Sequence, residues 1–131
     1  MKQAMWRTVL GLGGSLLLGA GLMVGTAAPA SAAGCSGTHL DNWSITGGYI
    51  AVYYNSSTGK NCAMTYTNKP GKKQYIRVDI SASGGGSQTD KGSFTTYAGP
   101  VSVNAKGKCI SFAGQVGSGN PLEGVTNVYC D

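Results

Sequence analysis

Gln74–Ile80 (QYIRVDI) alternates apolar and polar side chains, and this alternation is the strongest indication of fold in the sequence. Successive side chains of a β-strand point to opposite faces, so Ile76, Val78 and Ile80 share one face and the residues between them share the other. We therefore predict a strand here, with the isoleucine and valine side chains in the core.

Further strand candidates occur along the rest of the chain. Tyr49–Tyr54 is the best of them, because it is rich in the β-branched and aromatic residues that suit a pleated surface. Four more have a similar character: Asn61–Thr67, Gly99–Val103, Cys109–Ala113 and Val125–Tyr129. Two have it more weakly: His39–Ile45 and Ser93–Tyr97.

Turn-forming residues separate these segments. Glycine supplies positive φ angles and proline a fixed φ, as chain reversals require. The expected turns are Gly47–Gly48, Ser57–Gly59, Lys69–Gly71, Gly84–Gly86, Asp90–Gly92, Lys106–Gly107 and Gly117–Pro121.

Short strands with turns roughly every eight to twelve residues predict an all-β fold. We predict a small antiparallel β-sandwich of about seven or eight strands, with a partly closed barrel as the alternative. The sandwich is favoured because Gly84–Gly86 and Gly114–Pro121 resemble longer connections that cross between two sheets.

The N-terminal segment has the layout of a secretory signal peptide. Lys2 and Arg7 provide a positive region, Val9–Val24 carries no charge, and Ala30–Ala32 consists of small residues before a cleavage point. A retained membrane anchor is the alternative, but the apolar stretch is short and rich in glycine. We therefore predict a secreted protein without a permanent membrane anchor.

Cleavage after Ala32 would remove residues 1–32 and leave residues 33–131 as one domain. A domain of this size has a thin core, and small exported domains often add covalent cross-links. All four cysteines lie in this part: Cys35, Cys62, Cys109 and Cys130. An even number in an exported chain predicts two disulfides. A zinc site is the alternative, but no pair has Cys-x-x-Cys spacing and His39 is the only histidine.

A faint internal repeat bears on the pairing of these cysteines. Asn55–Cys62 and Asn104–Cys109 both run from an asparagine through a Gly-Lys turn to a cysteine, and each could form a hairpin. If the two halves are related, Cys35 pairs with Cys62 and Cys109 with Cys130. Coincidence is the alternative, although this nearest-neighbour pairing is also the most natural of the three possible pairings.

Charge excludes one class of partner. The chain has ten Lys and Arg against five Asp and Glu. Without Lys2 and Arg7, eight remain against five, a net charge of +3. Nucleic-acid binding requires a wide basic face, so we do not expect it. The densest positive cluster is the segment with Lys69, Lys72 and Lys73, which could contact anionic wall polymers or be an ordinary solvated loop.

Residues suited to catalysis are few. His39 lies near Asp41, but no Gly-x-Ser-x-Gly motif or comparable nucleophile site is present. A pair of carboxylates that meets only in the fold is the remaining enzymatic alternative. We predict no catalytic residues, no cofactor and no metal, and therefore not an enzyme.

Aromatic residues favour binding. One tryptophan of the mature part and seven tyrosines have the amphipathic character that sugar platforms and protein interfaces share. Tyr54 and Tyr75 are the candidates for exposure. The predicted contact surface therefore comprises Lys69, Lys72, Lys73, Tyr54 and Tyr75, at the loop ends of the sandwich. Its expected partner is a secreted or cell-surface protein or a wall polymer.

Three segments resemble a known family. Tyr53–Cys62 (YYNSSTGKNC), Tyr97–Val101 (YAGPV) and Gly107–Ile110 (GKCI) are similar to the spore-associated protein A family, small exported proteins of Streptomyces and related actinomycetes. The resemblance spans most of the mature domain and includes all four cysteines. It implies an extracellular protein found with aerial spores or in the surrounding medium, and it brings no catalytic residues.

The sequence therefore predicts a secreted, non-enzymatic protein associated with the spore or cell surface that acts by binding. The alternative is an extracellular protein–protein interaction module, either an adaptor subunit of a secreted toxin assembly or an inhibitor of a secreted enzyme. A carbohydrate-binding module is a further alternative.

Overall fold

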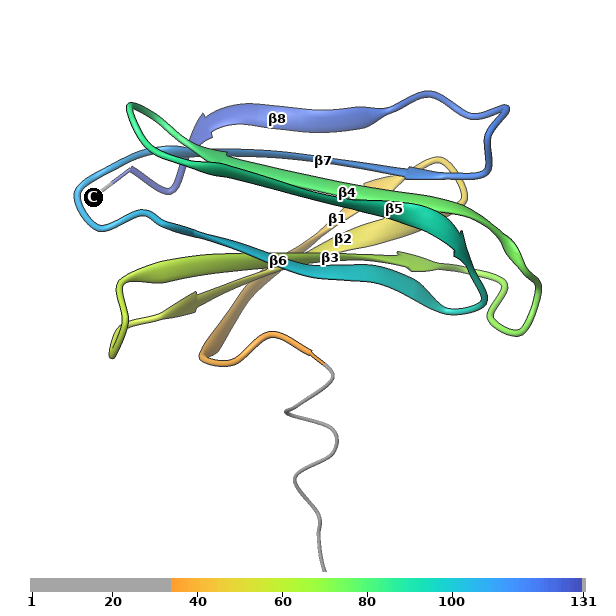
Figure 1. Ribbon diagram of the computed structural model, residues 1–131, viewed down its shortest axis with the longest axis horizontal. Helices are drawn as coiled ribbons and strands as arrows, with labels where there is room; N and C mark the ends of the chain where they lie inside the picture. The colour runs from red at the N-terminus through yellow and green to blue at the C-terminus, as the bar shows by residue number, and fades with distance from the viewer. Residues whose placement is uncertain (1–33, 131) are drawn as a thin grey trace, which may run out of the picture. The chain divides into compact units, whose positions relative to one another are not determined.

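Two four-stranded antiparallel sheets pack face to face in the computed structural model, which describes residues 34–130 (Figure 1). The strands in chain order are β1 Thr38–Ile45, β2 Gly48–Asn55, β3 Lys60–Thr67, β4 Gln74–Ala82, β5 Ser87–Phe94, β6 Tyr97–Asn104, β7 Ile110–Val116 and β8 Glu123–Val128. One sheet has the order β1-β2-β3-β6 and the other β5-β4-β7-β8. Each sheet keeps two free edges, so the predicted sandwich is confirmed and the barrel is not.

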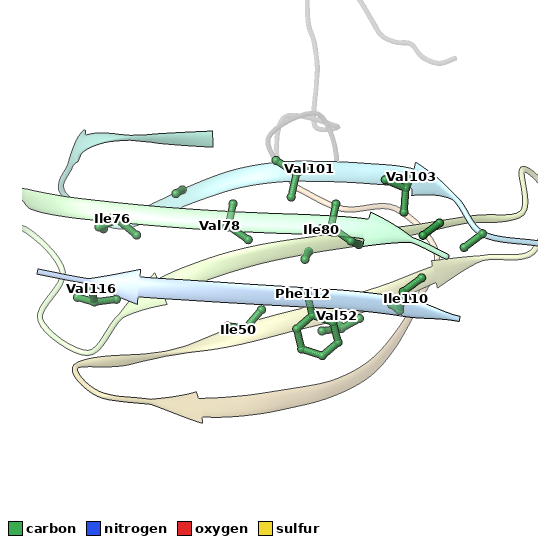
Figure 2. Close-up of a cluster of buried hydrophobic side chains, with 14 residues drawn as sticks. Ile50, Val52, Ile76, Val78, Ile80, Val101, Val103, Ile110, Phe112 and Val116 are labelled. Atoms are coloured by element: carbon green, nitrogen blue, oxygen red, sulfur yellow. The ribbon is translucent and has the colours of Figure 1, made fainter. Parts of the chain in front are cut away.

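The core lies between the sheets, along β4 and β7 on one side and β2, β3 and β6 on the other (Figure 2). The alternation in Gln74–Ile80 has the predicted result, because Ile76, Val78 and Ile80 are at most 1% exposed. Phe112 of β7 lies among them in the same layer. The described part of the chain contains no helix long and apolar enough to cross a membrane.

Three predicted turns or connections differ in the structure. Gly84–Gly86 closes the β4–β5 hairpin within one sheet and does not cross between sheets. Asp90–Gly92 lies in the middle of β5, and the predicted strand Ser93–Tyr97 spans the end of β5 and the start of β6. The chain changes sheet at residues 68–73, 95–96 and 105–109 instead. The expected connection Gly114–Pro121 does not cross between sheets either, because it joins β7 to its neighbour β8 in the same sheet, and its first residues belong to β7.

The polar character of β5 has a structural cause. Its inward side chains bond to the free edge of β6: Gly99 N donates to Asp90 Oδ2, and Ser102 N donates to Gln88 Oε1, each at 2.8 Å. Backbone groups at an open edge need such partners. Polar residues of β5 therefore cover the edge of β6 on this side of the sandwich. Because these residues are polar, the sequence of β5 lacks the alternation of apolar residues that would identify it as a strand.

The two Gly-Lys turns make different kinds of connection in the fold. The turn of Asn55–Cys62 forms the β2–β3 hairpin as predicted, but Asn104–Cys109 is a connection between sheets and not a hairpin. The two turns nevertheless meet, since Ala105 N donates to Gly59 O at 2.9 Å.

Both predicted disulfides are present, and Cys35 is bonded to Cys62 and Cys109 to Cys130. The first joins the segment before β1 to β3, and the second joins the start of β7 to the residues that follow β8. The predicted signal peptide, residues 1–32, lies outside the described residues.

Candidate functional site

The predicted lysine loop, residues 69–73, connects β3 in one sheet to β4 in the other. Its lysines Lys69, Lys72 and Lys73 are exposed. The loop is anchored by Thr67, whose Oγ1 accepts hydrogen bonds from Lys69 N at 3.0 Å and Gln74 Nε2 at 2.9 Å. The positive charges therefore project from a braced connection.

Of the two tyrosines assigned to the same contact surface, Tyr75 lies beside the lysine loop and Tyr54 lies far from it. Tyr75 is the second residue of β4 and lies on the outer face of the β5-β4-β7-β8 sheet. Tyr54 lies near the other end of β2, opposite Thr38 and Asn61, and shares the core-facing side of that strand with Ile50 and Val52. Both tyrosines are half-buried. The structure thus separates Tyr54 from the lysine loop by most of a strand length.

A different set of aromatic residues comes together on the outer face of the β1-β2-β3-β6 sheet, the face turned away from the other sheet (Figure 1). The register pairs Tyr49 with Tyr66 and Tyr66 with Tyr97, which places one row of tyrosines across β2, β3 and β6. It also pairs His39 of β1 with Tyr53 of β2. We call His39, Tyr49, Tyr53, Tyr66 and Tyr97 the tyrosine face.

The rings of the tyrosine face contact one another. Tyr49 and Tyr66 are stacked, with ring centroids 5.2 Å apart and an interplanar angle of 14°. Tyr66 and Tyr97 are tilted by 51° at 5.6 Å, and His39 meets Tyr53 edge-on at 5.1 Å. Such offset and edge-to-face pairs are favourable arrangements for aromatic rings. The face is therefore a packed layer of rings and not a scatter of exposed side chains.

The rings cover smaller side chains on the same face. Ala51 and Met64 point outward, away from the core, yet they are only 2% and 1% exposed. The Tyr66 hydroxyl donates to Met64 Sδ at 3.4 Å. One side of each half-buried tyrosine ring therefore covers these small side chains, and the other side is exposed to solvent.

An open hollow of about 350 Å³ lies in this layer. Its lining residues are His39, Asn42, Tyr49, Ala51, Tyr53 and Tyr66. At its edge, His39 Nε2 and Asn42 Oδ1 are 2.8 Å apart. The lining contains no Lys, Arg, Asp or Glu. The hollow therefore offers ring surface, hydroxyl and amide groups, and no carboxylate or ammonium charge.

The close packing of the rings raises the pKa of the Tyr66 hydroxyl. Burial raises the pKa of its hydroxyl above 10.0, and the nearby hydroxyls of Tyr53, Tyr49 and Tyr97 raise the pKa further. The Tyr66 hydroxyl therefore remains protonated, and able to donate a hydrogen bond, throughout the ordinary pH range.

The acids of the described residues all have partners within the protein. Asp41 Oδ1 accepts from Asn42 N, Asp90 Oδ2 from Gly99 N, and Glu123 Oε2 from Thr46 N. Asp79 forms an ion pair with Arg77 at 3.0 Å, and this interaction raises the pKa of Arg77. Within residues 34–130 no three His, Cys, Asp or Glu side chains cluster as a metal site would require.

Sequence reasoning selected Tyr54 and Tyr75 and missed the tyrosine face. The alternation rule that located β4 also applies to Tyr49–Tyr54, where Ile50 and Val52 are buried and Tyr49 and Tyr53 must face outward. That signal was present in the sequence. The alignment of Tyr66 between Tyr49 and Tyr97 depends on strand register, which the sequence does not specify.

Comparison with known proteins supports the resemblance drawn from the three quoted segments. The chain is 35% identical over 130 residues to spore-associated protein A of Streptomyces coelicolor, an alignment that covers 88% of this chain and 82% of that protein. No family model matches the chain, and no solved structure matches it.

Proposed function

We propose a binding role for this chain, which belongs to the spore-associated protein A family. In this proposal the protein is exported, associates with the surface of the spore or cell, and works by contact and not by catalysis. The tyrosine face is the contact surface. The observation that carries the proposal is its packed row of half-buried rings on the sheet face that is turned away from the core.

The location has three supports. The relative's name associates that protein with spores. Both cysteine pairs of this chain are oxidised, which is typical of proteins outside the reducing cytosol. The signal-peptide pattern of residues 1–32 agrees with an extracellular or surface location.

The proposal of a non-enzymatic role is supported by the partners of the acidic side chains within the protein. Asp41, Asp90 and Glu123 each accept a backbone N–H, and Asp79 is paired with Arg77. General acid or base catalysis by Asp or Glu needs a carboxyl group that is free to exchange a proton with a substrate. The tyrosine face, in contrast, has the amphipathic rings that are enriched at binding surfaces.

The proposal is tested with the protein recovered from the culture medium of an actinomycete host. Its intact mass should correspond to residues 33–131, and the protein should sediment with actinomycete spores or purified cell walls. The variant Tyr49→Ala/Tyr53→Ala should lose this attachment, whereas Tyr75→Ala, which removes a half-buried tyrosine from the other sheet, should retain it.

Three outcomes would contradict the proposal. A secreted species that still contains Val9–Val24 would contradict export by cleavage. A wild-type protein that sediments with neither spores nor walls, but forms a stable complex with another secreted protein, would replace surface association with the adaptor or inhibitor role. A hydrolytic activity that is lost in His39→Ala or Asp41→Ala would overturn the non-enzymatic role.

A further inference from the structure

We propose that the tyrosine face binds an uncharged glycan chain, with one pyranose ring seated in the hollow beside Tyr49 and Tyr53. This inference rests on the proposed binding function and names the ligand class for that surface. It commits to a neutral glycan because of the chemistry of the lining, the absence of Lys, Arg, Asp and Glu from the hollow, and the layout of the rings.

The lining matches the two kinds of surface that a pyranose ring presents. A sugar ring has flat faces of C–H groups and a rim of hydroxyl groups. The tyrosine face supplies aromatic surface from Tyr49, Tyr53 and Tyr66, and each of these rings carries a hydroxyl. Among the described residues, the hydroxyls of Tyr49 and Tyr53 make no hydrogen bond, so both can pair with sugar hydroxyls without breaking an internal contact.

The edge of the hollow adds polar groups at a defined position. His39 packs edge-on against Tyr53, and its Nε2 lies 2.8 Å from Asn42 Oδ1. The Asn42 amide group retains its Nδ2 hydrogens as donors toward a ligand. A ligand seated over Ala51 would therefore contact the tyrosine rings that line the hollow, together with an amide and an imidazole at its edge.

Charge selects among glycans. No Lys, Arg, Asp or Glu lines the hollow, so a carboxylate or phosphate entering it would lose water without meeting a lysine or an arginine. A neutral pyranoside has no such desolvation cost. The positive loop with Lys69, Lys72 and Lys73 lies beyond the end of β3 and is separate from the lining residues.

The shape of the surface favours a chain of sugars over a protein side chain. The floor of the hollow is filled, since Ala51, which lines it, is only 2% exposed. Binding hot spots of protein interfaces insert an anchor side chain into a deep pocket, and this shallow floor provides none. The row from Tyr49 to Tyr97 crosses three neighbouring strands, roughly 10 Å in all, which is longer than one sugar ring.

Calorimetric titration of the exported protein tests the inference. The neutral probes are cellohexaose and the fully N-acetylated chitohexaose, and the charged probe is hexagalacturonate. We expect at least one neutral hexamer to bind, the trimer of the same sugar to bind similarly, the monomer to bind much more weakly, and hexagalacturonate not to bind. Binding should change the tyrosine ultraviolet difference spectrum, a readout that reports directly on the rings.

Matched variants locate the site. Tyr53→Ala should weaken binding of the neutral hexamer by about tenfold, because truncation of a central aromatic contact typically costs more than 1 kcal/mol. Tyr75→Ala removes the same atoms from the outer face of the other sheet and should leave binding unchanged. Tyr53→Phe retains the ring and should lose less than Tyr53→Ala.

Absence of binding by both neutral hexamers at millimolar concentration would overturn the inference, as would equal losses in Tyr53→Ala and Tyr75→Ala or stronger binding of hexagalacturonate. If spores retain the protein through the tyrosine face while no glycan binds, the glycan inference fails and the proposed binding function stands. Capture of a secreted protein by this face, blocked by Tyr53→Ala, would assign it to a protein partner instead.

Discussion

Ile50 of β2 and Gly114 of β7 meet at the centre of the sandwich, where a Cβ atom on Gly114 would lie only 2.8 Å from Ile50 Cγ1. The same atom would collide with Thr65 Oγ1. The two sheets therefore approach each other here without room for another methyl group. The position requires glycine because of packing between the sheets and not because of its backbone angles.

Gly114→Ala should destabilise the protein by about 1 to 3 kcal/mol, because overpacking of a dense core forces its neighbours to shift. Urea unfolding monitored by tyrosine and tryptophan fluorescence measures this loss. Gly119→Ala is the matched control, since no atom lies within 4 Å of a Cβ there, and it should change stability by less than about 0.5 kcal/mol. Equal effects of the two substitutions would contradict the close approach.

Thr65→Val should leave stability unchanged or increase it by up to about 1 kcal/mol. Thr65 is fully buried, and its Oγ1 has no hydrogen-bond partner among the described residues. Valine has nearly the same shape and removes the unpaired hydroxyl. Thr65→Ser retains the hydroxyl and removes a buried methyl group, and should cost about 0.8 kcal/mol. A valine variant less stable than the serine variant would show that the hydroxyl has a partner.

Removal of either disulfide should destabilise the domain by about 3 kcal/mol. The two bonds close segments of 27 and 21 residues, so Cys35→Ala/Cys62→Ala and Cys109→Ala/Cys130→Ala should have similar effects. Urea unfolding measures both. Peptide mapping of the unreduced protein should link Cys35 with Cys62 and Cys109 with Cys130, and recovery of a Cys35–Cys130 peptide would contradict this connectivity.

Alkaline pH should destabilise the protein through Tyr66. The pKa of its hydroxyl is raised above 10.0 in the folded protein, so the unfolded chain releases this proton first as the pH rises. The contribution to stability is therefore complete below about pH 10 and is lost as the pH rises through the folded pKa. Urea midpoints between neutral and strongly alkaline pH measure the loss.

Tyr66→Phe should remove most of this alkaline loss, and Tyr75→Phe should retain it. Absorbance of the folded protein near the phenolate band should likewise lose its late-ionising component in the Tyr66 variant alone. An identical pH dependence in wild type and Tyr66→Phe would contradict the crowding of the rings as its cause.

Lys72→Glu/Lys73→Glu should weaken attachment to spores or walls, because the loop adds an electrostatic contact separate from the tyrosine face. The change should alter folding stability by less than about 0.5 kcal/mol. Both lysines are exposed on the braced loop. Attachment of the wild type should weaken with added salt, and the variant should lose this salt dependence. Lys91→Glu/Lys106→Glu makes the same charge change elsewhere on the surface and serves as the control. Unchanged attachment of the loop variant at low salt would show that attachment depends on the tyrosine face and not on the lysine loop.

The prediction from sequence agrees best with the structure where buried residues alternate regularly with exposed residues along a strand. Ile76, Val78 and Ile80 were predicted as core and are buried. The strand β5 (SQTDKGSF) was missed because its inward residues Gln88 and Asp90 bond to the backbone of β6 and do not join the apolar core. A polar edge strand has no hydrophobic period, so its sequence resembles a turn.

The amino-acid sequence by itself determined the all-β class, the apolar face of β4, the even set of cysteines and the resemblance to the family, because each depends on residue type and on spacing along the chain. Only the tertiary structure decided which sheet each strand joins and which tyrosines meet. Tyr49, Tyr66 and Tyr97 become neighbours through strand register, and a register is set by the packing of all the strands together. The same packing carries Tyr54 away from the lysine loop, because β2 runs from the end of the sandwich nearest that loop to the opposite end.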